Sequence, residues 1–369
     1  MKYLEKLLGD TPVEWKRLGE VTNYKQPNKY LVKSTDYKDY FPIPVLTAGK
    51  TFFLGYTNET TGVYKASENP VIIFDDFTTD NKWVDFDFKA KSGAMKMIIS
   101  KDESRIILKY IYYWLNTLPK IVDGDHKRRW INDYLNKLIP IPPLKVQQEI
   151  VRILDTFTRL IAELTAELTA RKKQYAYYRE KLLTFKAGEV EWKRLGEVTN
   201  ILRGRRLTRN LLSPTEKYPV FHGGLEPLGF YSDFNRPADT VMIINVGASA
   251  GTVGYSPVNF WSSDGCFCLE HSEVINNRFL YYYLLGEQHF FKSRVRVAGI
   301  PTLDAYTIEK LQIPIPPLKV QQEIVRVLDK FDTLATSISE GLPREIELRK
   351  KQYEYYREQL LTFPEGTNE

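Results

Sequence analysis

Basic side chains interleaved with aromatic ones are the residues of this chain whose types allow recognisable chemistry. Compact examples lie in the stretches 126–130 and 203–209. Lysine and arginine neutralise phosphates, and arginine also bridges the O6 and N7 atoms of guanine. For any single one of these residues, solvated surface is the alternative. Our candidates for contact with DNA are Lys82, Lys89, Lys91, Lys127, Arg128, Arg129, Arg203, Arg205, Arg206, Arg209, Arg294 and Arg296.

The sequence lacks the motifs of a self-sufficient enzyme on nucleic acid or nucleotides. It contains no phosphate-binding loop of the G-x-x-x-x-G-K-S/T type and no amino-methyltransferase motif. The segment Gly247–Gly254 departs from dinucleotide-binding spacing and favours a tight strand-turn-strand. We therefore predict no catalytic residue, no metal ligand and no bound cofactor. A cluster of aspartates could bind a metal ion, but the partner motif found in nucleases is missing beside it. We therefore expect a solvated loop at Asp75, Asp76, Asp80, Asp85 and Asp87.

Length and composition place the chain among ordinary globular proteins. It has 369 residues, of which 43% are hydrophobic and 27% charged, and its net charge is +6. This length predicts two or three domains, and the charge permits a polyanionic partner without requiring one. Two cysteines, Cys266 and Cys268, are too few for a disulfide framework. No secretion signal or membrane-length apolar run is present, so we expect a cytoplasmic protein.

Three stretches of the sequence occur twice. Val13–Asn23 reappears unchanged at Val190–Asn200, and Ile139–Arg152 reappears unchanged at Ile313–Arg326. Arg171–Phe185 reappears at 349–363 with two changes. Whole-domain duplication explains this pattern, because a solenoid needs at least three short repeats.

The parts between the repeats differ from each other. Residues 24–138 and 201–312 show no convincing sequence match, although both favour a mixed α/β fold with many strands. Short apolar runs predict strands at 70–74, 95–99, 240–245 and 267–269, and aromatic runs predict helices at 106–118 and 278–285.

A long amphipathic helix is predicted after each pair of prolines. From Ile150 to Phe185 apolar residues recur at steps of three and four, the pattern of a coiled coil, so we expect a helix over 144–185. In the second copy two consecutive steps of four reach Leu342 and Ile346. With Gly341 and Pro343 nearby, this stutter predicts a break near 340–343.

Helices of this kind need an apolar partner, and the nearest one is the other helix. We expect an antiparallel pair; two helices that each pack on their own domain are the alternative. The predicted interface places Ile150, Leu154, Phe157, Ile161, Leu164 and Leu168 against Ile324, Leu328, Phe331, Ala335 and Ile338. Further repeated residues are candidates either for this helix pair or for docking two identical partners: Gln147, Gln148, Tyr175, Tyr178, Arg179, Gln321, Gln322, Tyr353, Tyr356 and Arg357.

Within the first helix, residues 162–169 repeat one four-residue unit, Ala-Glu-Leu-Thr. A helix-forming stretch repeated by accident is one interpretation. The other is a length adjuster, because four residues extend a helix by about 6 Å and turn it by a net angle of about 40°. That rotation is close to the twist of one base-pair step of DNA, about 34°.

These motifs together resemble the specificity subunit of type I restriction–modification systems. The resemblance rests on two copies of I-P-x-P-P-L-x-x-Q-x-x-I before a heptad helix, on Thr-Ala-Glu-Leu at 165–168, and on R-K-K-Q-Y-x-Y-Y-R-E-x-L-L near each helix end. It implies an α+β tandem repeat with pseudo-twofold symmetry, in which two long antiparallel coiled-coil helices separate two globular target-recognition domains. The expected boundaries are 1–141 and 188–315 for the two domains, and 142–187 and 316–369 for the two helices.

The resemblance also implies a function and partners. Each domain is expected to read one half of a bipartite double-stranded DNA target, and the unlike domains imply an asymmetric target. The helix pair is expected to set the spacer. Two modification subunits would dock, and restriction subunits would join them in the prokaryotic cytoplasm. S-adenosylmethionine, ATP and magnesium are implied for those partners and not for this chain. The alternative is a self-sufficient nuclease or methyltransferase, and a coiled-coil adaptor without DNA contact is a third possibility.

Overall fold

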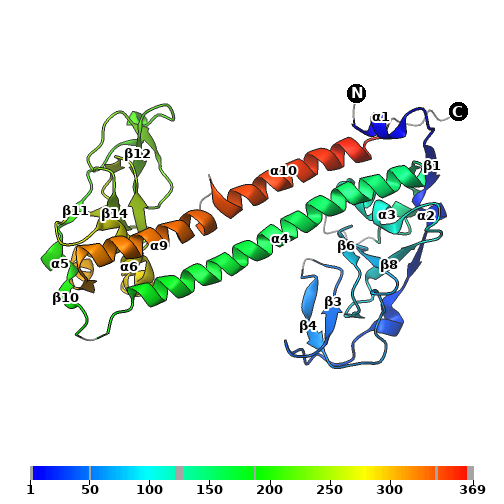
Figure 1. The fold of residues 1–369 in the computed structure, drawn as a ribbon, viewed down its shortest axis with the longest axis horizontal. Coiled ribbons are helices and arrows are strands. Elements are labelled where there is room, and N and C mark those ends of the chain that lie inside the picture. The colour runs from blue at the N-terminus through cyan, green and yellow to red at the C-terminus, as the bar shows by residue number, and fades with distance from the viewer. Residues whose placement is uncertain (1–2, 50, 121–127, 187, 337–339, 364–369) are drawn as a thin grey trace. The chain divides into compact units, whose positions relative to one another are not determined.

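The computed structural model describes residues 3–49, 51–120, 128–186, 188–336 and 340–363 (Figure 1). The chain forms two compact units. The first unit combines residues 1–163 with residues 346–369, and the second unit comprises residues 164–345. Each unit therefore holds one of the two unlike parts of the sequence together with segments from both repeated helical regions.

The first unit contains a two-stranded ladder, a four-stranded sheet and a three-stranded sheet. Its strands are β1 (Glu14–Arg17), β2 (Thr22–Lys25), β3 (Ile43–Leu46), β4 (Phe53–Thr57), β5 (Val71–Asp75), β6 (Asn81–Val84), β7 (Lys89–Ala90), β8 (Met95–Ser100) and β9 (Leu138–Ile141). The antiparallel four-stranded sheet has the order β2-β8-β5-β6, the three-stranded sheet has the order β4-β3-β7, and β1 pairs with β9. Its helices are α1 (Tyr3–Leu8), α2 (Leu18–Val21) and α3 (Leu108–Leu115), with 3-10 turns at Pro27–Tyr30 and Tyr134–Asn136.

The second unit repeats this topology strand for strand. Its strands are β10 (Glu191–Arg194), β11 (Ile201–Arg203), β12 (Tyr218–Phe221), β13 (Gly229–Tyr231), β14 (Thr240–Ile244), β15 (Val253–Ser256), β16 (Trp261–Ser262), β17 (Cys266–Leu269) and β18 (Gln312–Ile315). The sheet orders are β11-β17-β14-β15 and β13-β12-β16, and β10 pairs with β18. Its helices are α5 (Leu195–Val198), α6 (Asn277–Gly286), α7 (Gln288–Lys292) and α8 (Ala305–Glu309), with a 3-10 turn at Arg209–Leu211. Two sequences without a convincing match thus adopt one fold.

The central strand of each unit is buried on both faces, which explains its unbroken apolar sequence. In β5, Ile72 and Phe74 belong to the cluster that contains α3, whereas Ile73 packs with residues of the three-stranded sheet. In β14, Val241 and Ile243 likewise join α6 in one cluster. Side chains alternate between the faces of a strand, so a strand covered on both sides needs apolar residues throughout. The predicted strands are confirmed as β5, β8, β14 and β17, and the predicted helices as α3 and α6.

The long helices also form as predicted. They are α4 (Leu144–Leu183), α9 (Leu318–Thr336) and α10 (Gly341–Leu361), so the second helical region is broken where the stutter falls. Gly341 has a φ of +73°, and a Cβ there would lie 2.4 Å from the carbonyl oxygen of Thr333. Only glycine accepts this conformation and this close approach without strain, so the start of α10 requires glycine at residue 341.

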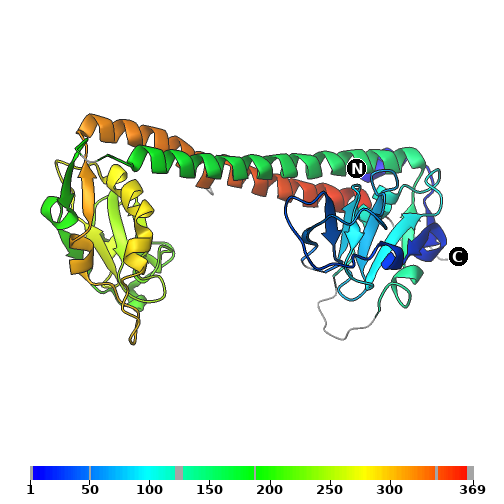
Figure 2. The ribbon, with the colours of Figure 1, turned by 90° about the horizontal axis from the view of Figure 1, so that it is seen from below.

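Within each unit the helices pair antiparallel, and an aromatic stack marks each seam. In the first unit Phe157 of α4 stacks on Tyr356 of α10, with ring centroids 5.3 Å apart. In the second unit Tyr178 of α4 stacks on Phe331 of α9 at the same distance, 5.3 Å. Phe157 and Phe331 are copies of each other, as are Tyr178 and Tyr356. Each copy therefore contributes one ring to each stack. The helices that carry these rings lie side by side within each unit (Figures 1 and 2).

The predicted partners across the seam are wrong, although Ile150, Leu154, Ile324 and Leu328 are all buried. Ile150 and Leu154 lie in one cluster with residues from the end of α10, including Leu360 and Leu361. Ile324 and Leu328 lie in another cluster, with Tyr175 from the later part of α4. In an antiparallel pair the start of one helix meets the end of the other, so Ile150 cannot face Ile324. Ile161, Leu164 and Leu168 are half-buried, Ala335 is buried, and Ile338 lies outside the described residues.

A buried glutamine fixes each unlike domain to its helix. The Gln147 side chain accepts a hydrogen bond from the backbone amide of Ile107 at 3.0 Å and donates to the carbonyl oxygens of Arg105 and Pro142 at 3.0 and 2.9 Å. Its copy, Gln321, accepts from the amide of Asn276 at 2.7 Å. It donates to the carbonyls of Val274 and Pro316 at 3.1 and 2.7 Å. The prediction that Gln147 and Gln321 dock partner subunits is therefore wrong, because both side chains are fully buried and hydrogen-bonded inside the protein.

A repeated aspartate makes a second attachment. Asp155 accepts a hydrogen bond from the Tyr113 hydroxyl of α3 at 2.5 Å, and its copy Asp329 accepts one from the Tyr282 hydroxyl of α6 at 2.6 Å. Burial and the bond to Asp329 raise the pKa of the Tyr282 phenol well above its usual range, so the phenol stays protonated and donates at physiological pH. The two copies of one helix aspartate thus each hold the domain of their own unit, although the two domains differ in sequence.

We expect Gln321→Ala to lower the free energy of unfolding by about 1–3 kcal/mol, because it leaves the part-buried amide of Asn276 without its acceptor. Urea unfolding of the full chain measures the change. The neighbouring Gln322→Ala is the matched control, since its exposed side chain predicts a change within about 0.5 kcal/mol. Equal losses for the two variants would contradict the role of Gln321.

Candidate nucleic-acid interface

Four arginines at the end of β11 and in the segment after it form a basic surface of the second unit. Arg203, Arg205, Arg206 and Arg209 are all exposed. Their backbone is held from behind, because the amide of Arg205 donates to the Ser262 carbonyl at 2.9 Å and its carbonyl accepts from the Trp261 indole at 2.7 Å. The arginine side chains are therefore free to contact a ligand on the outer side.

Gly204 makes this close backbone approach possible. A Cβ at residue 204 would lie 1.9 Å from the carbonyl oxygen of Ser263. No side chain fits at that distance, so the glycine between two arginines is a packing requirement of the segment.

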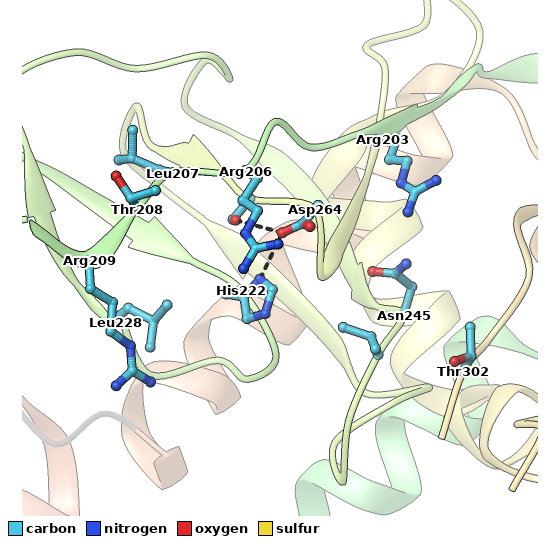
Figure 3. Close-up of a pocket in the computed structure, with 12 residues that line it drawn as sticks. Arg203, Arg206, Leu207, Thr208, Arg209, His222, Leu228, Asn245, Asp264 and Thr302 are labelled. Carbon is cyan, nitrogen blue, oxygen red and sulfur yellow. Dashed lines mark hydrogen bonds and ion pairs between the residues drawn. The ribbon is translucent and has the colours of Figure 1, made fainter. Parts of the chain in front are cut away.

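These arginines border a hollow of about 640 Å³ that the sequence did not predict (Figure 3). Arg203 is the last residue of β11, and Arg206 and Arg209 come from the segment after it. Thr208 comes from the same segment, and the other polar lining comes from distant parts of the second unit: His222, Asn245, Ser263, Asp264 and Thr302. Three arginines against one aspartate give the hollow a positive charge, which attracts an anion such as a nucleic-acid backbone.

Three further polar groups of the hollow come from loops after strands. His222 follows β12, and its Nδ1 accepts a hydrogen bond from the amide of Gly265 at 3.2 Å and lies 3.3 Å from Oδ1 of Asp264. Asn245 directly follows β14 and is 5% exposed. These three residues were not predicted from the sequence, because His222 is an isolated histidine and neither Asn245 nor Asp264 belongs to a motif. The position of Asn245 at the end of a buried strand was the available signal.

Arg294 and Arg296 are exposed but have partners within the second unit. The Arg294 guanidinium lies over the Phe290 ring, 3.7 Å from its centroid, and donates to the Phe290 carbonyl at 3.1 Å. Arg296 pairs with Asp304 at 3.3 Å. Exposed pairs of this kind contribute little to stability, so both side chains remain candidates for DNA contact.

The lysines of the first unit that are predicted to contact DNA differ in their exposure. Lys91 is exposed, and Lys82 is partly exposed in an ion pair with Asp80 at 2.9 Å. The prediction that Lys89 contacts DNA is wrong, because only 2% of this residue is exposed. Its ammonium group pairs with Glu59 at 3.1 Å and donates to the Thr61 carbonyl at 2.6 Å. An ammonium group that is buried and paired in this way is not available to DNA.

A buried ion pair lies beside Arg129 and Trp130, the last residues of the basic stretch. Asp76 and Lys96 are each about 1% exposed, with their charged atoms 3.4 Å apart. Asp76 also accepts from the backbone amide of Trp130 at 2.8 Å through Oδ1 and from that of Arg129 at 2.9 Å through its carbonyl. The solvated loop predicted for the aspartates is thus wrong at Asp75 and Asp76, which are buried. Lys127 lies outside the described residues, Arg128 is exposed and Arg129 is half-buried.

Several repeated residues are predicted either to pack in the helix pair or to dock partner subunits. The structure separates these two groups. Tyr178 and Tyr356 stack across the seams. Tyr175 is buried, and Tyr353 is half-buried against the core of the first unit. These four tyrosines therefore serve the helix pair. Gln148 and Gln322 are exposed in both copies and stay as predictions for partner docking.

The repeated fold and the basic hollow define a protein with two copies of one recognition fold, and comparison with known proteins identifies its family. Residues 12–171 and 188–348 each match the family described as the type I restriction modification DNA specificity domain. The chain belongs to this family, as a specificity subunit with two recognition domains.

Individual relatives and a solved structure agree with this assignment. The Escherichia coli EcoR124I/EcoR124II specificity subunit is 48% identical, over 99% of this chain and 98% of that protein. A putative type I restriction enzyme specificity subunit of Haemophilus influenzae is 31% identical, over 98% of each chain. The crystal structure of the type I restriction–modification S subunit from M. genitalium covers 100% of both chains with a TM-score of 0.74 and 19% identity, which shows a shared fold.

Among the described residues, no helix combines the length and the apolar character needed to cross a membrane.

We expect removal of one member of the buried pair, by Asp76→Ala or Lys96→Met, to lower the free energy of unfolding by about 3–5 kcal/mol, because the other charge stays buried alone. Urea unfolding measures both changes. The double variant should lose less than the sum of the two single losses, since it leaves neither charge unpaired. Additive losses would contradict a direct interaction between the two side chains.

Proposed function

We propose that each recognition domain reads one half of an asymmetric, bipartite target in double-stranded DNA. One observation carries the proposal: two domains of the same topology, attached to helices by the same glutamine and aspartate, expose different side chains. The first unit exposes Lys91 and Arg128, whereas the second exposes the arginines around its hollow. A shared backbone with unlike surface residues is what reading two different sequences requires, because base readout depends on side chains.

We propose that the long helices set the spacer between the two half-sites. The antiparallel seams support this role, because residues added within α4 lengthen the helix and rotate the part of it beyond the insertion. The repeated unit at 162–169 lies in a mostly exposed stretch of α4. One further unit adds about 6 Å and about 40°, so a helix can accept it and keep its continuity.

We further propose that the chain works as the non-catalytic part of a larger complex. Two modification subunits would dock on the surfaces that occur in both copies, which include Gln148 and Gln322, and restriction subunits would join through them. Identical residues in two copies suit two identical partners. The catalytic groups, S-adenosylmethionine, ATP and magnesium belong to those partners, and the complex acts in the prokaryotic cytoplasm.

The proposal is tested by reconstituting the chain with the modification subunit of the same system and mapping methylated adenines across a genome. We expect one bipartite motif with two unlike halves. Replacing residues 24–138 with the matching segment of another family member should change one half and leave the other half unchanged. A palindromic target, or an unchanged target after the exchange, would contradict the proposal. Methylation or cleavage by the purified chain alone would support the enzymatic alternative instead.

Insertion of one more Thr-Ala-Glu-Leu unit after Leu168 should lengthen the non-specific spacer while both half-sites persist, because only the helix between the domains changes. The same methylation mapping reads the spacer directly. Four alanines inserted at the same place are the matched control, since a role of length alone predicts the same longer spacer. An unchanged spacer in both variants would refute the length adjuster.

A further inference from the structure

We propose that Asn245 reads an adenine in the half-site of the second domain, with the hollow beside it as the place where the base edge enters. This proposal rests on the proposed function, since it assumes that the second domain contacts DNA. It goes further by naming one residue, one base and the atoms that pair.

The first observation is an unused hydrogen-bonding atom. Asn245 lines the hollow and is 5% exposed, and its Oδ1 is buried with no hydrogen-bond partner among the described residues (Figure 3). A buried polar atom left without a partner costs about 1–3 kcal/mol. A ligand that brings a donor removes this cost, so the free acceptor favours a ligand with an N–H group.

The second observation is that the backbone of Asn245 is fixed while its amide can turn. The backbone amide donates to the Gly265 carbonyl at 3.2 Å, and the backbone carbonyl accepts from Leu303 at 2.8 Å. These bonds hold the residue at the end of β14. The last side-chain torsion of asparagine is broad and soft, so the amide is able to present both its oxygen and its nitrogen to the hollow.

The first unit supplies a matched comparison. Asp76 directly follows β5, as Asn245 directly follows β14, and β5 and β14 are equivalent strands. Both side chains are buried. In the first unit Oδ1 of Asp76 accepts a hydrogen bond from the amide of Trp130, and Oδ2 forms an ion pair with the Lys96 ammonium group at 3.4 Å. The same position is therefore used for internal structure in one unit, whereas in the second unit the acceptor at this position is left open beside a basic hollow.

The pairing chemistry selects adenine. In the major groove adenine presents the N6 amino donor beside the N7 acceptor, which match the oxygen and the nitrogen of an asparagine amide. Guanine presents acceptors at both places, and cytosine offers a donor without the neighbouring acceptor. The arginines at the rim, Arg203, Arg206 and Arg209, supply positive charge for the phosphates on either side of the base.

The test uses the chain reconstituted with its modification subunit and DNA duplexes that carry the mapped target. In each duplex one adenine of the second half-site, on either strand, is replaced by purine, which lacks the N6 amine, or by 7-deazaadenine, which lacks N7. We expect one adenine at which both replacements weaken binding by about 10- to 100-fold, the range of one bidentate contact. Because these measurements use the unaltered protein, they do not depend on a variant that folds.

Asn245→Ala should then bind the natural duplex about 10- to 100-fold more weakly and lose its sensitivity to both replacements at that adenine. Arg206→Ala is the matched control from the same hollow: it should weaken binding to all duplexes alike and reduce the salt dependence by about one phosphate contact. The half-site of the first domain should remain recognised with both variants.

Two results would overturn the assignment. One is an Asn245→Ala complex that keeps both its affinity and its sensitivity to the replaced adenine. The other is a half-site in which no adenine replacement weakens binding. If the unaltered chain recognised neither half-site, that result would instead count against the proposed function.

Discussion

The antiparallel packing of two copies of one helical sequence is the constraint on which the rest of this structure depends. A helix with an apolar stripe needs a partner stripe, and duplication of the sequence provides one with the same side chains. The Phe157–Tyr356 and Phe331–Tyr178 stacks show the result, since each copy supplies one ring to each stack. Because the helices pair in this way, the first residues of α4 and of α9 each lie at the seam of one unit. The recognition domain of that unit attaches to them.

The attachment of the domains relies on a few buried polar residues. Gln147 and Gln321 satisfy the backbone groups just before α3 and α6, and Asp155 and Asp329 hold a tyrosine from each of those helices. These contacts involve mostly backbone atoms and one phenol. The remaining residues of a domain are therefore free to change while its attachment is preserved, which is a physical reason why so little of the two domains is shared in sequence.

Some functional predictions followed from the sequence, and others failed for an identifiable reason. The arginines after β11 are exposed as expected, whereas Lys89 is buried against Glu59. Asp76 was assigned to a solvated loop, yet it is buried against Lys96. In these failures a charged side chain found its partner far along the chain, and nothing in the local sequence identifies such a partner. Asn245 was missed because the hollow that it lines is assembled from separated segments.

The sequence by itself determined the duplication, the long helices, the break at Gly341 and the family, because repeats, heptad spacing and a glycine in a stutter are local patterns. Only the tertiary structure decided that residues 24–138 and 201–312 share one topology, which residues meet across the seams, and which repeated residues are buried. The physical reason is that a fold of this kind requires alternating burial and a few well-placed polar groups, which many unrelated sequences provide. Pairing between distant residues depends on where those strands and helices meet in space.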